Sequence, residues 1–152
     1  RILDEYLMPV ATPEYLASHP QFAAGEDISG VTLLHDSAPW AGAPEFIEWR
    51  TWLEAERPDW LDALGGVQFN MSILAVGAAL NHQGVAMART AMVLDEIRSG
   101  RLVHVFGRLV QAPAHYMLLV QHEDDRRVTV FCEWLKEECR RFMEVRRQLL
   151  SI

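Results

Sequence analysis

Short apolar runs alternate with amphipathic stretches along most of this chain, and this alternation is the feature that most restricts its fold. The apolar runs predict strands, and the stretches between them have the spacing of helices. The predicted strands are residues 6–11, 31–35, 67–69, 85–88, 102–106 and 115–121. The predicted helices are residues 12–18, 45–56, 70 or 72 to about 82, 90–99 and 127–149. Because strands that alternate with helices form βαβ units, we expect an α/β fold, with a largely parallel sheet and helices on both faces.

Polar and glycine residues mark the boundaries of one predicted helix in particular. Asn70 or Ser72 is expected to cap its start, and Gly84 is expected at the C′ position after its end near His82. Residues 107–114 carry no regular pattern. They are therefore the best candidate for a crossing between two domains.

The chain has 152 residues, enough for one domain with a core of its own, and a formal net charge of −7. Modules that grip a phosphate backbone are usually basic, so we expect no direct DNA contact from these residues. No apolar run approaches the roughly 18 residues of a membrane-spanning helix, so no membrane partner is expected. Cys132 and Cys139 fall on one predicted helix about 10 Å apart. We expect them to be two thiols in a reducing cytoplasm.

Asn70 and Ser72 interrupt an otherwise apolar segment where a predicted strand passes into a helix. Parallel α/β sheets bind ligands beyond the carboxyl ends of their strands, where helix N-termini present free N–H groups. A serine hydroxyl there caps the helix, which is worth about 1 kcal/mol, or binds a polar or anionic ligand, and the two roles are compatible. Thr12 likewise is either an N-cap before Pro13 or a ligand contact.

His35 and Asp36 end another predicted strand. Such a pair is compatible with general-base chemistry, with lining a ligand cleft, or with hydrogen bonding at a strand end. The chain has no Gly-x-Ser-x-Gly nucleophile elbow, so we expect no catalytic residue and no enzyme.

Possible metal ligands gather near one predicted turn: His115, His122, Glu123, Asp124 and Asp125. Their spacing matches no zinc or calcium template, so we expect a solvated turn, no metal and no cofactor.

Two further residues keep two interpretations each. Trp40 lies in a loop rich in Pro and Gly and is either a cleft or lid residue or an ordinary loop residue. Arg89 ends a predicted strand and either meets a ligand carboxylate or forms a surface ion pair.

Six segments, in order along nearly the whole chain, resemble the effector-binding domain of LysR-type transcriptional regulators. The similarity is closest to the subgroup with the glycine-cleavage activator and the β-lactamase regulator. The segments are residues 6–16 (YLMPVATPEYL), 33–36 (LLHD), 49–53 (WRTWL), 67–73 (VQFNMSI), 83–89 (QGVAMAR) and 99–103 (SGRLV).

The resemblance implies a periplasmic-binding-protein-like (type 2) fold, in which two subdomains of Rossmann-like βα units are joined by two crossover strands and bind the effector between them. Residues 9–108 would form the second subdomain and residues 109–114 a crossover. Residues 115–152 would return to the first subdomain, and residues 1–8 would form a crossover strand region. The first subdomain would be only partly present, without its opening strands, the linker helix and the winged helix-turn-helix.

The resemblance also implies site residues. In the family's β-lactamase regulators, a serine at the strand-to-helix turn and a tyrosine on the returning strand contact the effector, and the matching positions are Ser72 and Tyr116. Met71 makes the site larger and more apolar than in those relatives, so the ligand need not be the same. The predicted ligand-binding residues are Thr12, His35, Asn70, Ser72 and Tyr116.

The implied function is that of a cytoplasmic sensor domain. A small polar or anionic metabolite would close the two subdomains and change how a homodimer or tetramer presents DNA-binding heads, which lie in the absent N-terminal winged helix-turn-helix. The small-residue stretch Ala75–Ala79 lets two backbones approach closely, so we expect it at the dimer interface. The alternative is a solute-binding protein of the periplasmic type, which shares the fold.

Overall fold

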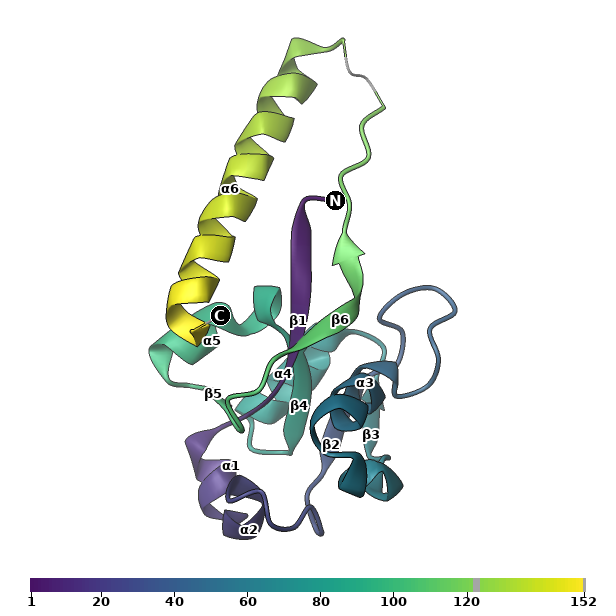
Figure 1. The fold of residues 1–152 in the computed structure, drawn as a ribbon, viewed down its shortest axis with the longest axis vertical. Helices are drawn as coiled ribbons and strands as arrows, with labels where there is room; N and C mark the ends of the chain where they lie inside the picture. The colour runs from purple at the N-terminus through teal and green to yellow at the C-terminus, as the bar shows by residue number, and fades with distance from the viewer. Residues whose placement is uncertain (122–123, 152) are drawn as a thin grey trace. The chain divides into compact units, whose positions relative to one another are not determined.

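The computed structural model describes residues 1–121 and 124–151. The chain forms two compact units, of which unit 2 is Tyr6–Pro113 and unit 1 combines Arg1–Glu5 with Ala114–Ile152. The described elements, in chain order (Figure 1), are β1 (Leu3–Ala11), α1 (Pro13–Ala17), α2 (Pro20–Ala23), β2 (Leu33–Asp36), α3 (Ile47–Glu56), the 3-10 helix η1 (Pro58–Ala63), β3 (Val67–Phe69), α4 (Ser72–Leu80), β4 (Val85–Arg89), α5 (Thr90–Ser99), β5 (Val103–His104), β6 (Val110–Tyr116) and α6 (Arg126–Leu150).

The alternation of strands and helices is as predicted, but one strand is displaced. The strand expected at residues 115–121 is β6, which lies at Val110–Tyr116 and begins inside residues 107–114, the segment that we expected to be irregular. Residues 117–121 are not in a strand, and Leu119 is 85% exposed. The apolar run alone misplaced the strand, because its side chains are not buried on a sheet.

The sheet of unit 2 is parallel in part. Its strand order is β3-β2-β4-β1-β5; β2 pairs in parallel with β3 and β4, whereas β1 pairs antiparallel with β4 and β5. The register places Leu7 beside Arg89 and Val10 beside Ala86. The end of β1 therefore lies at the start of β4, at the opposite edge from the carboxyl ends of β2, β3 and β4.

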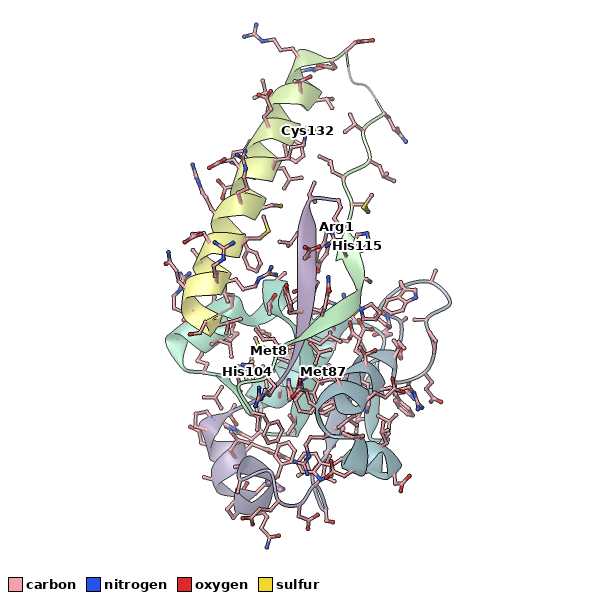
Figure 2. All side chains as sticks on the ribbon, in the orientation of Figure 1. Arg1, Met8, Met87, His104, His115 and Cys132 are labelled. Carbon is pink, nitrogen blue, oxygen red and sulfur yellow. The ribbon has the colours of Figure 1, made fainter. Side chains whose placement is uncertain are left out.

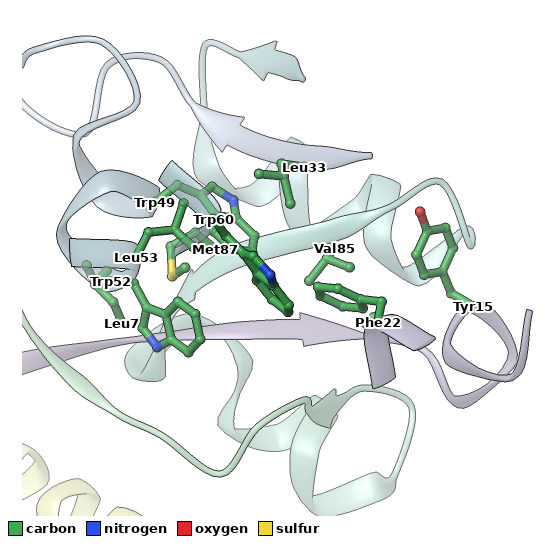
Figure 3. Close-up of a cluster of buried hydrophobic side chains, with 11 residues drawn as sticks. Leu7, Tyr15, Phe22, Leu33, Trp49, Trp52, Leu53, Trp60, Val85 and Met87 are labelled. Atoms are coloured by element: carbon green, nitrogen blue, oxygen red, sulfur yellow. The ribbon is translucent and has the colours of Figure 1, made fainter. Parts of the chain in front are cut away.

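Aromatic side chains fill one face of this sheet (Figure 3). The cluster joins alternate residues of β1 and β4, such as Leu7 and Met87, to Phe22 of α2 and to Trp49 and Trp52 of α3. Both indole N–H groups donate to backbone carbonyls, from Trp49 to Leu34 at 3.0 Å and from Trp52 to Arg108 at 3.1 Å. A buried indole needs such a partner, so the Trp49 bond attaches α3 to β2 and the Trp52 bond attaches it to the loop before β6.

The intervening strand residues serve the other face. Met8 on β1, which is labelled in Figure 2, is fully buried there, as are Ala86 and Ala88 on β4. Helix α4 packs on β2 and β4 through Ala75, Val76, Ala78 and Ala79, which are all buried. The alanines therefore bring α4 close to its own sheet, and they are not on its exposed side.

Unit 1 has few buried side chains. Among its described residues, the buried apolar ones are Leu3 and Cys132, and the buried charged ones are Glu5 and Arg146. Arg146 Nη1 donates to the backbone oxygen of Asp4 at 2.7 Å and lies 3.9 Å from Glu5 Oε1. Large apolar side chains such as Phe131 and Trp134 are more than half exposed. Unit 1 thus lacks an apolar core comparable to that of unit 2.

Candidate functional site

The carboxyl ends of the three parallel strands bring polar residues to one edge of unit 2. Asp36 ends β2, Phe69 ends β3 and Arg89 ends β4. Helices α4 and α5 both begin at this edge, and neither has a hydrogen bond from an N-cap side chain. The edge therefore combines two helix N-termini with charged groups, as ligand-binding edges of α/β sheets do.

A buried ion cluster holds the middle of this edge. Arg89 Nε donates to Glu48 Oε1 at 2.7 Å, and Arg89 Nη2 lies 3.4 Å from Asp36 Oδ2. Asp36 Oδ1 also accepts a hydrogen bond from the Ala38 N–H at 3.0 Å. Both carboxylate residues are buried, and the guanidinium joins β4 to β2 and to the first turn of α3. Of the two interpretations of Arg89, an ion pair is what the structure contains, although the pair is not on the surface.

Ser72 lies at this edge as predicted, but it does not cap α4. The N-cap is Met71, and Ser72 is the first helical residue. The Ser72 hydroxyl instead donates to Met92 Sδ in the first turn of α5, at 3.1 Å. Asn70, which is exposed, precedes them. The expected capping role of Asn70 or Ser72 is wrong, and their ligand-binding role stays a prediction.

His35 points away from Asp36, because neighbouring residues on a strand face opposite sides. Its side chain is 2% exposed and packs on Phe46 and Trp49, with ring centroids 4.5 and 6.3 Å away. The Nε2–H group donates to the Gly65 carbonyl at 2.5 Å. The structure thus uses His35 in packing between β2 and α3, and does not bring it together with Ser72.

Burial of His35 predicts that the protein loses stability in mild acid. Burial lowers the pKa of His35 below its usual value, and the Gly65 hydrogen bond and Glu45 only partly oppose this. Because the folded-state pKa lies below the unfolded value of about 6.5, the stability is present above pH 6.5 and is lost as the pH falls below it. One such group contributes at most about 1.4 kcal/mol per pH unit. Urea unfolding at pH 7.5 and 5.5 should show a smaller loss for His35→Gln than for the wild type; equal losses would contradict this role.

Thr12 is at the far edge of the sheet. It follows the antiparallel strand β1, and its Oγ1 accepts a hydrogen bond from the Tyr15 N–H at 3.2 Å, which makes it the N-cap of α1. The same oxygen lies 2.7 Å from His82 Nδ1. A polar cavity of about 410 Å³ opens here between the ends of α4 and α5. Thr12 therefore does not join the carboxyl-end residues.

Tyr116 ends β6 in unit 1, where it is partly exposed and its carbonyl accepts a hydrogen bond from the Ile2 N–H at 3.0 Å.

Two of the considered metal ligands, His122 and Glu123, lie outside the described residues. Within the described part of the chain, no three His, Cys, Asp or Glu side chains are placed to share a metal ion. In the same part, no helix combines the length and apolarity needed to cross a bilayer.

Two residues of the edge were not singled out from the sequence. Glu48 was hidden within an amphipathic helix, although its place in the first turn after Phe46 is typical of an acidic helix start. Met92 carried no signal of function, because methionine is an ordinary helix residue.

Comparison with known proteins identifies the family. The family model described as LysR substrate binding domain matches residues 1–140. The chain belongs to this family. The resemblance stated from the sequence is therefore confirmed, and so is the α/β, periplasmic-binding-protein-like fold that it implied. The effector domain of AmpR from Pseudomonas aeruginosa has the same fold, with a TM-score of 0.69 at 22% identity over 97% of this chain and 67% of that one.

Two curated relatives of this LysR-family chain are transcriptional regulators by name. The chain is 34% identical to the HTH-type transcriptional regulator DsdC of Escherichia coli K12, over 90% of this chain and 44% of DsdC. It is 31% identical to the glycine cleavage system transcriptional activator of the same strain, over 89% of this chain and 43% of the activator. The chain thus spans less than half the length of either relative.

Proposed function

We propose that this chain is the ligand-sensing part of a LysR-type transcriptional regulator, and that it is not an enzyme. It binds a small polar or anionic metabolite at the carboxyl edge of unit 2, around Asn70 and Ser72. The observation that carries the proposal is that two helices whose N-cap side chains form no cap hydrogen bond begin beside a serine hydroxyl at that edge, in a chain of this family.

The electrostatics of the edge support a polar ligand. The N-terminus of a helix carries a partial positive charge and N–H groups directed outward, which favour anionic groups. The Arg89 cluster fixes the strand ends and the start of α3 around this point. A site on rigid elements holds a ligand in one geometry, as sensing requires.

The domain assignment follows the same proposal. Residues 9–108 act as the second effector subdomain, and residues 115–152 belong to the first. The exposure of Phe131 and Trp134 in unit 1 supports an incomplete first subdomain. A regulator that presents DNA-binding heads works in the cytoplasm and reaches DNA through a winged helix-turn-helix. Ligand binding alters its output only if the ligand prefers one closure state.

Ser72→Ala tests the proposed site. A thermal-shift screen of the intact regulator against amino acids and cell-wall fragments supplies the effector. We expect the variant to lose about 10-fold in effector affinity, which is the contribution of one hydrogen bond, and less than about 0.5 kcal/mol in stability, since Ser72 caps nothing.

Tyr116→Phe is expected to weaken the same response without changing DNA affinity in the absence of effector.

Unchanged effector affinity in Ser72→Ala contradicts the site. For Tyr116, an equal loss of basal DNA affinity would mean that the tyrosine is structural.

We also propose that the intact regulator forms a homodimer through the outer side of α4. This helix carries no charged residue, and Ile73 and Leu74 are 54% and 44% exposed. No atom lies within 4 Å of the place that a Cβ would take at Gly77, which allows the backbone of a second protomer to come close. Val67 and Met71 extend the exposed apolar surface beside it. The role that we expected for Ala75–Ala79 is revised, because its three alanines and Val76 are buried in unit 2.

A charge on this surface is expected to separate the protomers. Ile73→Glu buries a carboxylate in an apolar interface, so the dimer dissociation constant should rise at least about 100-fold. Ala63→Glu, an exposed position on η1, serves as the control with the same added charge. Light scattering after size-exclusion chromatography measures both. A dimer that survives Ile73→Glu unchanged contradicts this interface.

A further inference from the structure

The contact between Ser72 and Met92 has a defined direction. Ser72 Oγ lies 3.1 Å from Met92 Sδ, and a thioether sulfur has no hydrogen, so the serine donates and the sulfur accepts. The bond joins the first turns of α4 and α5, the helices that start at the carboxyl edge. Ser72 and Met92 are each half-buried, so the serine oxygen is not sealed from solvent.

We propose that Met92 sets the hydrogen-bonding polarity of the ligand site. By taking the Ser72 proton, Met92 leaves the Ser72 oxygen to act as an acceptor toward the ligand. The effector therefore presents a hydrogen-bond donor, a hydroxyl or an N–H group, to Ser72. This inference rests on the proposed function, because it names the ligand group that meets Ser72. Met92 acts through Ser72 and is a positioning residue.

The preference for a donor group depends on the hydrogen bond between Ser72 and Met92, which a ligand with only an acceptor must break. A ligand with only an acceptor at this point binds Ser72 through the hydroxyl proton, which first has to leave Met92. A neutral hydrogen bond changes an affinity from a few-fold to about ten-fold, and a thioether is a weak acceptor. We therefore expect a preference of about 5-fold for a donor over an acceptor of the same shape. Without the sulfur the hydroxyl rotates freely, and this preference disappears.

The contact itself is tested without any ligand. The intact regulator, labelled with methionine carrying a ¹³C-methyl group, gives one NMR signal per methionine, and Met92→Leu assigns that of Met92. Ser72→Ala should shift the Met92 signal and leave that of Met8, which is fully buried on the sheet, in place. A Met92 signal that is the same with and without the Ser72 hydroxyl overturns the inference.

The polarity is tested with two probes of equal charge, lactate and its O-methyl ether 2-methoxypropanoate. Each is titrated into the wild type, into Met92→Leu and into Met143→Leu, a methionine of α6 outside the proposed site that serves as the control. The wild type and Met143→Leu should prefer lactate about 5-fold more strongly than Met92→Leu does. Steric differences between the probes cancel, because the ratio of affinities is compared across variants.

The same ratio in the wild type and in Met92→Leu overturns the inference. This outcome is distinct from a failure of the proposed function. If Ser72→Ala still weakens the effector response, the proposed site is supported and only the proposed role of Met92 is contradicted. If Ser72→Ala leaves the response intact, the proposed site itself is contradicted.

Discussion

Arg89→Met is expected to destabilise the protein by about 3–5 kcal/mol, because it leaves Asp36 and Glu48 buried without their cation. Methionine is similar in length to the arginine stem, so the loss of packing is small by comparison. The guanidinium bonds β4 to both β2 and α3, and its removal loosens the carboxyl edge as well. Urea unfolding followed by tryptophan fluorescence measures the change, since Trp49 and Trp52 are core residues of α3 itself.

Two comparisons separate this effect from a general cost of losing an arginine. Arg101→Met removes an exposed arginine that pairs with Glu96 Oε2 at 2.6 Å, and it should cost less than about 1 kcal/mol. Adding Glu48→Gln to Arg89→Met should recover part of the loss, because one of the two buried charges is then gone. Equal costs for Arg89→Met and Arg101→Met would show that the cluster does not hold the edge.

Gly84→Ala is expected to cost about 3 kcal/mol or more. A Cβ atom at this position would lie 2.4 Å from the Thr32 carbonyl oxygen and 2.9 Å from Leu34 Cγ. The carbonyl belongs to the backbone and already accepts from the Val85 N–H at 2.9 Å, so it cannot move without disturbing the β2–β4 pair. The thermal midpoint and urea midpoint should both fall.

Gly77→Ala is the matched control for Gly84→Ala. Gly77 lies inside α4 with nothing within 4 Å of the added methyl group, so the substitution should stabilise the folded chain by about 0.5–1 kcal/mol when the dissociated monomer is measured. The two changes add the same methyl group, which meets open space at Gly77 and the Thr32 carbonyl at Gly84. Similar effects from both would contradict the close approach at Gly84.

The alternation of apolar and amphipathic segments was enough to predict the fold class, whereas strand direction was not. β1 runs antiparallel to β4, which lies far away in the sequence. No local sequence pattern predicts that pairing. This reversal moves Thr12 to the far edge of the sheet.

The end of α4 differs from the prediction as well. The residue in the αL conformation after α4 is His82, with φ of 58°, and not Gly84. Gly84 instead allows the close approach of the Thr32 carbonyl.

The candidate site was predictable where it depends on strand ends and unpredictable where it depends on side-chain direction. Asn70 and Ser72 follow β3 and reach the carboxyl edge as expected. His35 is next to Asp36 in sequence, yet the pleat turns it into the core. The Ser72 hydroxyl donates its hydrogen bond to Met92 and does not cap its own helix. This contact depends on how α4 and α5 pack together.

Backbone NMR shift mapping with the effector found by screening shows which part of the chain holds the ligand. We expect the amide signals that move to belong to the carboxyl edge of unit 2: Ser37, which follows Asp36 at the end of β2, Asn70 to Ile73, and the start of α5. Movement centred instead on Thr12, His82 and Arg101, around the cavity at the opposite edge, would contradict it.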